Sequence, residues 1–148
     1  MKQLVLNWTG PFGIRDLIPK ELRGCPSLYF VEHDSEIMYV GKAETEGAFR
    51  RAKDHFRGQG DSIGRWILEG RDGSKIRIWV AWIAGEGCSE LINDAEKLLI
   101  FRLDTRANVN HSEKYEGNPL HIINKGDHPA KLPVEIKSLN AQKPINST

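Results

Sequence analysis

Cysteine is scarce in this chain, and long apolar runs are absent. Only Cys25 and Cys88 occur in 148 residues, and neither has the nearby Cys or His partners of a zinc site. We therefore expect two reduced thiols packed as small apolar groups. No apolar run reaches the roughly 18 residues that a membrane-spanning helix needs, and the first residues lack the apolar core of a signal peptide. These absences predict a cytoplasmic, intracellular protein with no membrane partner.

A large excess of one charge is also lacking. The net charge is +1, with 21 basic and 20 acidic residues, so charge alone does not indicate a nucleic-acid partner. The two signs are nevertheless separated along the chain, because residues 42–77 carry a net +3 and residues 78–120 a net −3. A basic segment beside an acidic one suits a phosphate-binding surface next to a metal-binding carboxylate, although most charge clusters are solvated faces.

Local patterning predicts three clear strands and one weaker one. Residues 27–32 and 36–40 are rich in apolar and aromatic side chains and flank a polar turn, which is typical of an antiparallel hairpin. Residues 75–83 alternate apolar and polar side chains and give the strongest strand signal. Residues 120–123 form a short strand candidate.

Helical spacing predicts helices over 47–57 and 62–69 and a longer one from Ser89 to about Leu103. The resulting order predicts an α+β domain in which a small three-stranded, mostly antiparallel sheet is flanked by helices. Residues 27–110 are the expected core. We expect residues 1–26 to be an N-terminal extension packed on it, and residues 111–148 to be a C-terminal extension with a disordered end.

Tyr29 and Tyr39 lie on the two strands of the predicted hairpin. In an arbitrary hairpin both would most often be core aromatics. Tyr39, however, is closely followed by Gly41 and Lys42. A glycine permits close approach by another group, and the lysine adds a positive charge.

Arg51 and His55 stand four residues apart on the predicted helix 47–57, so they share one helix face. An arginine offers a bidentate donor fork to a phosphate, and a histidine exchanges a proton near neutral pH. This pairing suits phosphodiester cleavage, although a solvated basic face would show the same spacing.

Glu96 lies at the border of the apolar stripe of the predicted helix that begins at Ser89. A carboxylate in this position suits Mg²⁺, a hard cation that prefers oxygen ligands. The alternative is an ordinary surface glutamate. Asn108 follows just beyond that helix.

In this order, the motifs resemble those of the GIY-YIG nuclease superfamily. Ser27-Leu28-Tyr29 stands in the place of GIY and Tyr39-Val40-Gly41 in the place of YIG. The R-x-x-x-H of Arg51 and His55, the AEKLLI segment with Glu96, and Asn108 complete the pattern. The resemblance covers residues 27–108, about half of the chain.

Three departures leave alternatives open. Ser27 replaces the first glycine of the motif. The loop before Arg51 is longer than in the nuclease subunit of bacterial nucleotide-excision repair, so Arg50 is an alternative arginine. The proline that often precedes the final asparagine is missing, so Asn110 competes with Asn108.

The resemblance implies a GIY-YIG-like fold and a metal-dependent endonuclease that hydrolyses phosphodiester bonds in DNA, with a stand-alone restriction enzyme as one option. In this interpretation Glu96 is the metal ligand and holds one Mg²⁺ or Mn²⁺. Arg51 stabilises the phosphate charge, and Lys42 and Arg50 are further substrate-binding candidates. The alternative is a catalytically silent module that binds nucleic acid or protein.

The resemblance also assigns catalytic roles to Tyr29, Tyr39, His55 and Asn108. Tyr29 and Tyr39 position or deprotonate the attacking water, and His55 assists proton transfer. Because tyrosine has an unperturbed pKa of about 10, it needs nearby cations to act as a base. The sequence decides neither which tyrosine acts nor whether the substrate is DNA or RNA.

Double-stranded DNA is the expected partner, and a homodimer on DNA is one possible assembly. One active site per chain meets two opposed strands, and a two-fold dimer matches the symmetry of a duplex. Residues 8–12 and 120–123 offer apolar material for a dimer contact. The alternative is that both segments cover the core of a monomer.

Overall fold

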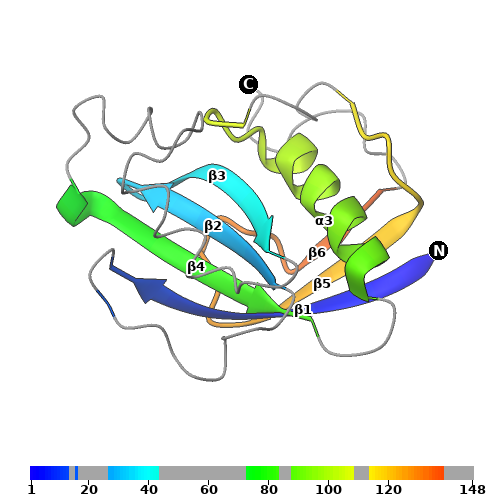
Figure 1. The fold of residues 1–148 in the computed structure, drawn as a ribbon, viewed down its shortest axis with the longest axis horizontal. Coiled ribbons are helices and arrows are strands. Elements are labelled where there is room, and N and C mark those ends of the chain that lie inside the picture. Colours follow the sequence, from blue (N-terminus) through cyan, green and yellow to red (C-terminus); the bar gives the residue numbers. More distant parts are fainter. Residues whose placement is uncertain (14–15, 17–26, 44–72, 84–87, 109–113, 139–148) are drawn as a thin grey trace.

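The structure of the protein, a computed structural model, describes residues 1–13, 16, 27–43, 73–83, 88–108 and 114–138. Within these ranges the chain forms a six-stranded sheet and a single α-helix (Figure 1). The elements are β1 (Lys2–Phe12), β2 (Ser27–His33), β3 (Glu36–Ala43), a 3₁₀ turn (Gly73–Lys75), β4 (Ile76–Trp82), α3 (Cys88–Leu103), β5 (Leu120–Gly126) and β6 (Glu135–Lys137).

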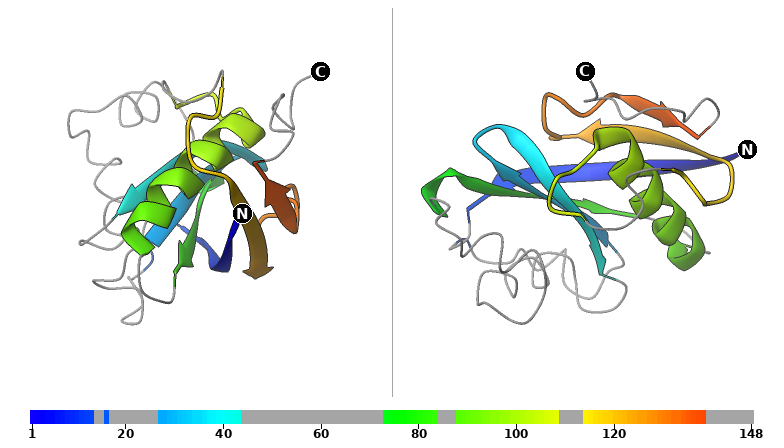
Figure 2. Two further views of the ribbon diagram at one scale, coloured as in Figure 1. Left: turned by 90° about the vertical axis from the view of Figure 1, so that its right-hand side faces the viewer. Right: turned by 90° about the horizontal axis from the view of Figure 1, so that it is seen from above.

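The sheet is mixed, with the strand order β3-β2-β4-β1-β5-β6. β1 pairs antiparallel with β4 and parallel with β5, and the other neighbours pair antiparallel. α3 lies along one face of this sheet (Figure 2). Within the described ranges, β3 and β6 are therefore the two edge strands.

The prediction of a small three-stranded sheet flanked by helices is wrong. β2, β3 and β4 form close to the predicted ranges, but they make up only half of a larger mixed sheet. β1 lies between β4 and β5 in the interior of the sheet, whereas residues 1–26 had been predicted to be an N-terminal extension packed on the core. The predicted helices over 47–57 and 62–69 lie outside the described residues.

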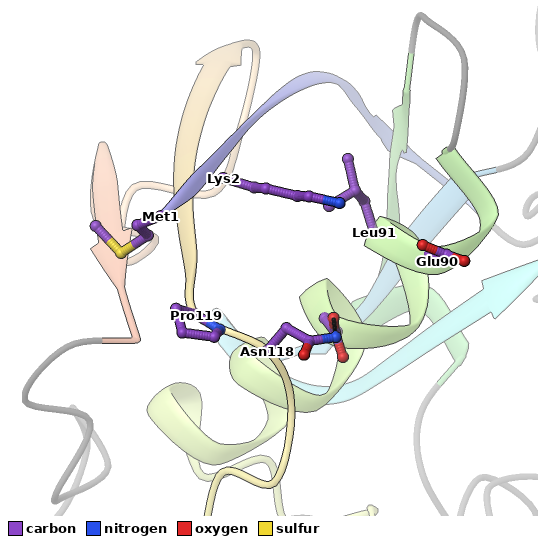
Figure 3. A pocket seen from close by; sticks show the side chains of 7 residues that line it. Met1, Lys2, Glu90, Leu91, Asn118 and Pro119 are labelled. Atoms are coloured by element: carbon purple, nitrogen blue, oxygen red, sulfur yellow. Dashed lines mark hydrogen bonds between the residues drawn. The ribbon is translucent and has the colours of Figure 1, made fainter.

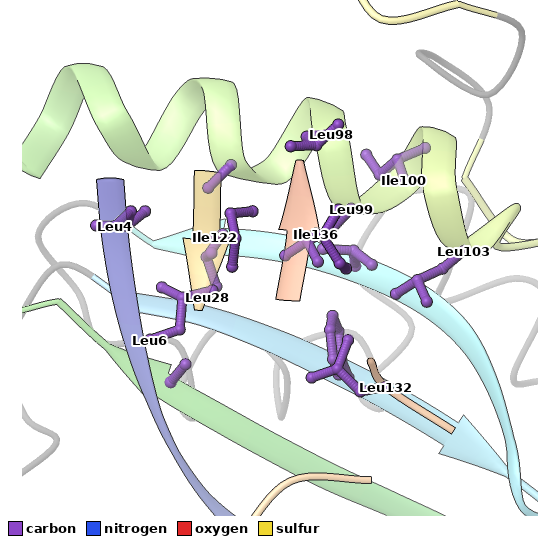
Figure 4. Packing of buried hydrophobic residues seen from close by; sticks show 14 of the residues in the cluster. Leu4, Leu6, Leu28, Leu98, Leu99, Ile100, Leu103, Ile122, Leu132 and Ile136 are labelled. Atoms are coloured by element: carbon purple, nitrogen blue, oxygen red, sulfur yellow. The ribbon is translucent and has the colours of Figure 1, made fainter. Parts of the chain in front are cut away.

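The core between α3 and the sheet is built from alternate strand residues. Leu4, Leu6 and Trp8 of β1 point to the α3 face, as strand alternation requires. α3 contributes the helically spaced Ile92, Ala95, Leu98, Leu99 and Leu103 (Figure 4). Burying each large aliphatic side chain contributes about 1.5–3 kcal/mol, so this interface fixes α3 on the sheet.

A buried asparagine ties the C-terminal strands to β1. The indole nitrogen of Trp8 donates to Asn124 Oδ1 at 2.8 Å, and Asn124 Nδ2 donates to the Pro133 carbonyl at 2.8 Å. Asn124 is buried, so these bonds satisfy polar atoms that would otherwise be costly to bury. They hold the segment before β6 against β5.

Residues 8–12 and 120–123, which had been considered for a dimer contact, both belong to the sheet. Trp8 is 2% exposed and Leu120 is 1% exposed. The side chains of Trp8 and Leu120 are therefore buried within the chain itself. No helix in the described part of the chain is long and apolar enough to cross a membrane.

Candidate active site

The Tyr29 side chain crosses the neighbouring strand at a glycine. Tyr29 on β2 is paired with Gly41 on β3, and only 1% of Tyr29 is exposed. A Cβ added at Gly41 would lie 2.2 Å from Tyr29 Cζ and 2.3 Å from its hydroxyl oxygen. The tip of the Tyr29 ring thus occupies the space of a side chain at position 41. Its hydroxyl therefore lies over β3, the outermost strand on this side of the described sheet.

Tyr39 joins Tyr29 on the same face of the hairpin. It is half-buried on β3, two residues before Gly41, so both residues face the same side of the strand. The two tyrosine rings have centroids 6.0 Å apart and are tilted by 40°. Leu28 and Phe30 belong to the core under α3. The tyrosine pair therefore lies on the opposite face of the sheet.

Asn108 holds the outer edge of β3. Its Oδ1 accepts a hydrogen bond from the Val40 amide at 2.9 Å, and its Nδ2 donates to the Val40 carbonyl at 2.9 Å. The Ala107 amide donates to the Met38 carbonyl at 2.9 Å. Because Val40 lies between Tyr39 and Gly41, the Asn108 carboxamide fixes the backbone that carries both. These contacts describe a positioning residue rather than a group aimed at substrate.

The flank of α3 nearest to β3 carries Glu96 and Asn93, both half-buried. Residues three apart on a helix are neighbours on its surface, so these two side chains share the flank. Lys42 Nζ donates a hydrogen bond to Asn93 Oδ1. Strand alternation directs Lys42 to the α3 side of the sheet and Gly41 to the other side. Lys42 and the tyrosine pair therefore lie on opposite faces of β3, which is an edge strand of the described sheet.

The structure describes only some of the candidate site residues that the sequence suggested. Tyr29, Tyr39, Lys42, Glu96 and Asn108 are described, and all five lie on β2, β3, α3 or the turn that follows α3. The predicted basic helix residues Arg50, Arg51 and His55 lie outside the described residues, and so does Asn110.

The donor set suits a hard cation. Glu96 offers a carboxylate, and Mg²⁺ and Mn²⁺ prefer oxygen ligands. No group of three or more His, Cys, Asp or Glu side chains that could hold a metal occurs among the described residues. The predicted site is of a different kind, because it uses one carboxylate and leaves the other positions to water and phosphate.

A cavity of about 340 Å³ lies on another flank of α3 (Figure 3). It is bounded by the start of β1, the first turns of α3 and residues 118–119, and its charged lining groups are Lys2, Glu90 and Asp94. None of the candidate catalytic residues lines it. Asn118 Nδ2 donates to Asp94 Oδ2 at 3.1 Å, so this wall ties residues 114–119 to α3.

Tyr115 is a hydrogen-bond donor to the neighbouring Asn118. Its hydroxyl donates to the Asn118 carbonyl. Burial raises the pKa of Tyr115 to about 12, and the negative charge of Asp94 adds to this shift. The raised pKa favours the protonated hydroxyl that donates this hydrogen bond.

In comparisons with known proteins, no family model, curated protein or solved structure matches the chain. The functional interpretation therefore depends on the residues themselves. Sequence reasoning missed Asn93 among them. The signal that could have identified it is its spacing of three residues from Glu96 on a helix that had been predicted.

Proposed function

We propose that the protein is a metal-dependent endonuclease that hydrolyses phosphodiester bonds in DNA at the outer edge of β3. The observation that carries this proposal is the arrangement of Tyr29, Tyr39 and Gly41. The Tyr29 ring on β2 contacts the Tyr39 ring on β3, and the Tyr29 hydroxyl lies over Gly41. Two aromatic side chains in a core can pack together without such a close approach to a glycine. In this protein the close approach brings the polar hydroxyl of Tyr29 to the edge of the sheet.

The acidic and basic groups of the proposed site have different roles in phosphodiester hydrolysis. Glu96 would hold the divalent ion, which, when bound, supplies charge that polarises the phosphate and stabilises the leaving oxygen. Lys42 adds a compact positive charge on the same side of the sheet. Arg51, assigned from its spacing to His55, supplies the donor fork for the phosphate oxygens.

The exposures of the two tyrosines separate their roles. Tyr39 is half-buried, whereas Tyr29 is almost fully buried. A group that orients or deprotonates water must be reached by water, so we assign this role to Tyr39. Tyr29 keeps its hydroxyl at the Gly41 backbone and supports the Tyr39 ring.

Nicking of a supercoiled plasmid tests the proposal. The purified protein should produce nicked circles with Mg²⁺ or Mn²⁺ and none when EDTA is present. Tyr39→Phe keeps the ring but removes the hydroxyl, so this variant should nick the plasmid much more slowly. Purified in the same way, it also controls for contaminating nucleases. Plasmid binding without nicking in either metal would support the silent binding module instead.

A further inference from the structure

We infer that Asn93 is a positioning residue that holds the ammonium group of Lys42 on the flank of α3 that carries Glu96. Asn93 lies outside the set of residues that the sequence motifs suggested. The inference rests on the proposed nuclease function, because it assigns to Lys42 a fixed place beside the scissile phosphate.

The contact itself joins two different elements. Lys42 Nζ, from β3, donates to Asn93 Oδ1, from α3, and both residues are half-buried. A lysine has a long flexible stem and loses considerable rotamer freedom when its end is held. A fixed acceptor therefore determines where the Lys42 charge is found.

The position of the acceptor decides what the charge can do. Asn93 precedes Glu96 by three residues, which places their Cβ atoms about 5–6 Å apart on one helix surface. The Lys42 ammonium is thereby held one side chain away from the predicted metal ligand. A phosphate bound to an ion at Glu96 would lie within reach of both positive charges.

The chemistry of asparagine suits this task. A carboxylate at position 93 would also accept the hydrogen bond, but it would neutralise the Lys42 charge and add a second anion beside Glu96. A neutral amide holds the ammonium without placing another negative charge beside it. Asn93→Asp should therefore keep the contact and still slow the reaction.

A double-mutant cycle, in which single-turnover DNA cleavage rates are measured for the wild type, the two single variants and the double variant, tests the inference. Lys42→Met and Asn93→Ala should each slow the reaction about tenfold or more, because small misplacements at a reacting group are costly. The double variant should be no slower than Lys42→Met alone, since Asn93 acts only through Lys42. Asn118→Ala is the matched control. It also removes an asparagine contact to α3, at Asp94, and it should cleave at the wild-type rate.

A second measurement needs neither DNA nor metal. In lysine ¹⁵N-ammonium NMR spectra of the wild-type protein, the held ammonium of Lys42 should give a slowly exchanging signal, assigned by its loss in Lys42→Met. The signal should also disappear in Asn93→Ala and persist in Asn118→Ala. Absence of the signal from the folded wild type would overturn the contact and the inference with it.

The outcomes separate the inference from the function. If the wild type cleaves DNA and the two losses multiply in the double variant, Asn93 does not act through Lys42. The inference then fails while the nuclease function stands. If the folded wild type cleaves no DNA with Mg²⁺ or Mn²⁺, the proposed function fails, and the inference fails for that reason.

Discussion

The tip of the Tyr29 ring lies where a side chain at position 41 would have to be. A Cβ at Gly41 would lie 2.2 Å from Tyr29 Cζ. Two carbon atoms that are not bonded to each other cannot lie so close, so the backbone or the ring would have to move. The register of β2 and β3 therefore explains why position 41 is a glycine: a larger side chain there would clash with Tyr29. The same contact links the two halves of the motif, which are separate in the sequence.

Gly41→Ala should destabilise the protein by about 1–3 kcal/mol, because it overpacks a well-filled contact. The backbone of β3 or the Tyr29 ring must move, so the variant should also lose most of its cleavage activity. Thermal and urea unfolding measure the first effect and plasmid nicking the second. Gly13→Ala is the control, since the nearest atoms to a Cβ there lie 3.6 Å away.

Replacing Tyr29 should partly relieve the clash at position 41. In the background of Gly41→Ala, the shorter side chain of Tyr29→Leu should recover part of the lost stability but none of the activity. If Gly41→Ala alone unfolds like the wild type, the described packing of Tyr29 against Gly41 is contradicted.

Asn108→Ala should expose the Val40 amide to hydrogen exchange and destabilise the protein by about 1–3 kcal/mol, since it leaves backbone groups without partners. Asn108→Asp keeps the acceptor for the Val40 amide but loses the donor to the Val40 carbonyl, so it should be destabilised as well. Asn110→Ala, at the competing asparagine of the sequence pattern, should leave the Val40 amide protected. Loss of protection in Asn110→Ala but not in Asn108→Ala would reverse this assignment.

Local sequence patterns predicted individual strands but not how they assemble. The hairpin, β4, α3 and the start of β5 follow from alternation and helical spacing. The alternation of Leu4, Leu6 and Trp8 was also present, but the sequence near Gly10 and Pro11 favoured an extension over a strand. The parallel pairing of Leu4 with Ile122 joins distant segments. No local periodicity encodes such a partner, so the sheet was predicted too small.

The roles assigned to the candidate site residues stay predictions, but their positions can be compared with the structure. Tyr29, Tyr39 and Glu96 were named from motif order, and the structure brings the two tyrosines together. The Lys42–Asn93 contact was not predictable, because it depends on how α3 packs against β3. Asn108 was named as catalytic, but its bonds to the Val40 backbone appear only once the turn after α3 is seen to fold back onto β3.

Tyr115 should titrate well above an ordinary tyrosine. Its pKa is raised to about 12 by burial and, to a smaller extent, by Asp94, so its protonated form is favoured in the folded protein. The stabilisation that this group provides is complete below its unfolded pKa of about 10 and is lost as the pH rises through about 12.

The ultraviolet absorbance of tyrosinate, followed after rapid pH jumps, measures this titration. The chain has three tyrosines, and the highest-pH step should be missing in Tyr115→Phe. Asp94→Asn should move that step to lower pH. A Tyr115→Phe titration that keeps the step would show that another tyrosine produces it.

Arg51→Ala should slow cleavage far more than Arg50→Ala. A charge donor directed at a transition state is typically worth about 2.7–4 kcal/mol, and only Arg51 has the four-residue spacing to His55. Single-turnover rates of the two variants decide between them. A larger loss at Arg50 would mean that the longer loop after Tyr39 shifts the catalytic position by one residue.

The most direct test of the nuclease proposal is the metal-dependent nicking activity of Glu96→Gln. An amide is a much weaker ligand for a hard ion than a carboxylate, so the variant should fold, bind DNA and fail to nick it with either Mg²⁺ or Mn²⁺. Glu90→Gln, an exposed glutamate on the cavity flank of α3, should nick at the wild-type rate. Wild-type nicking by a Glu96→Gln protein with an unchanged thermal melt would contradict the proposed site.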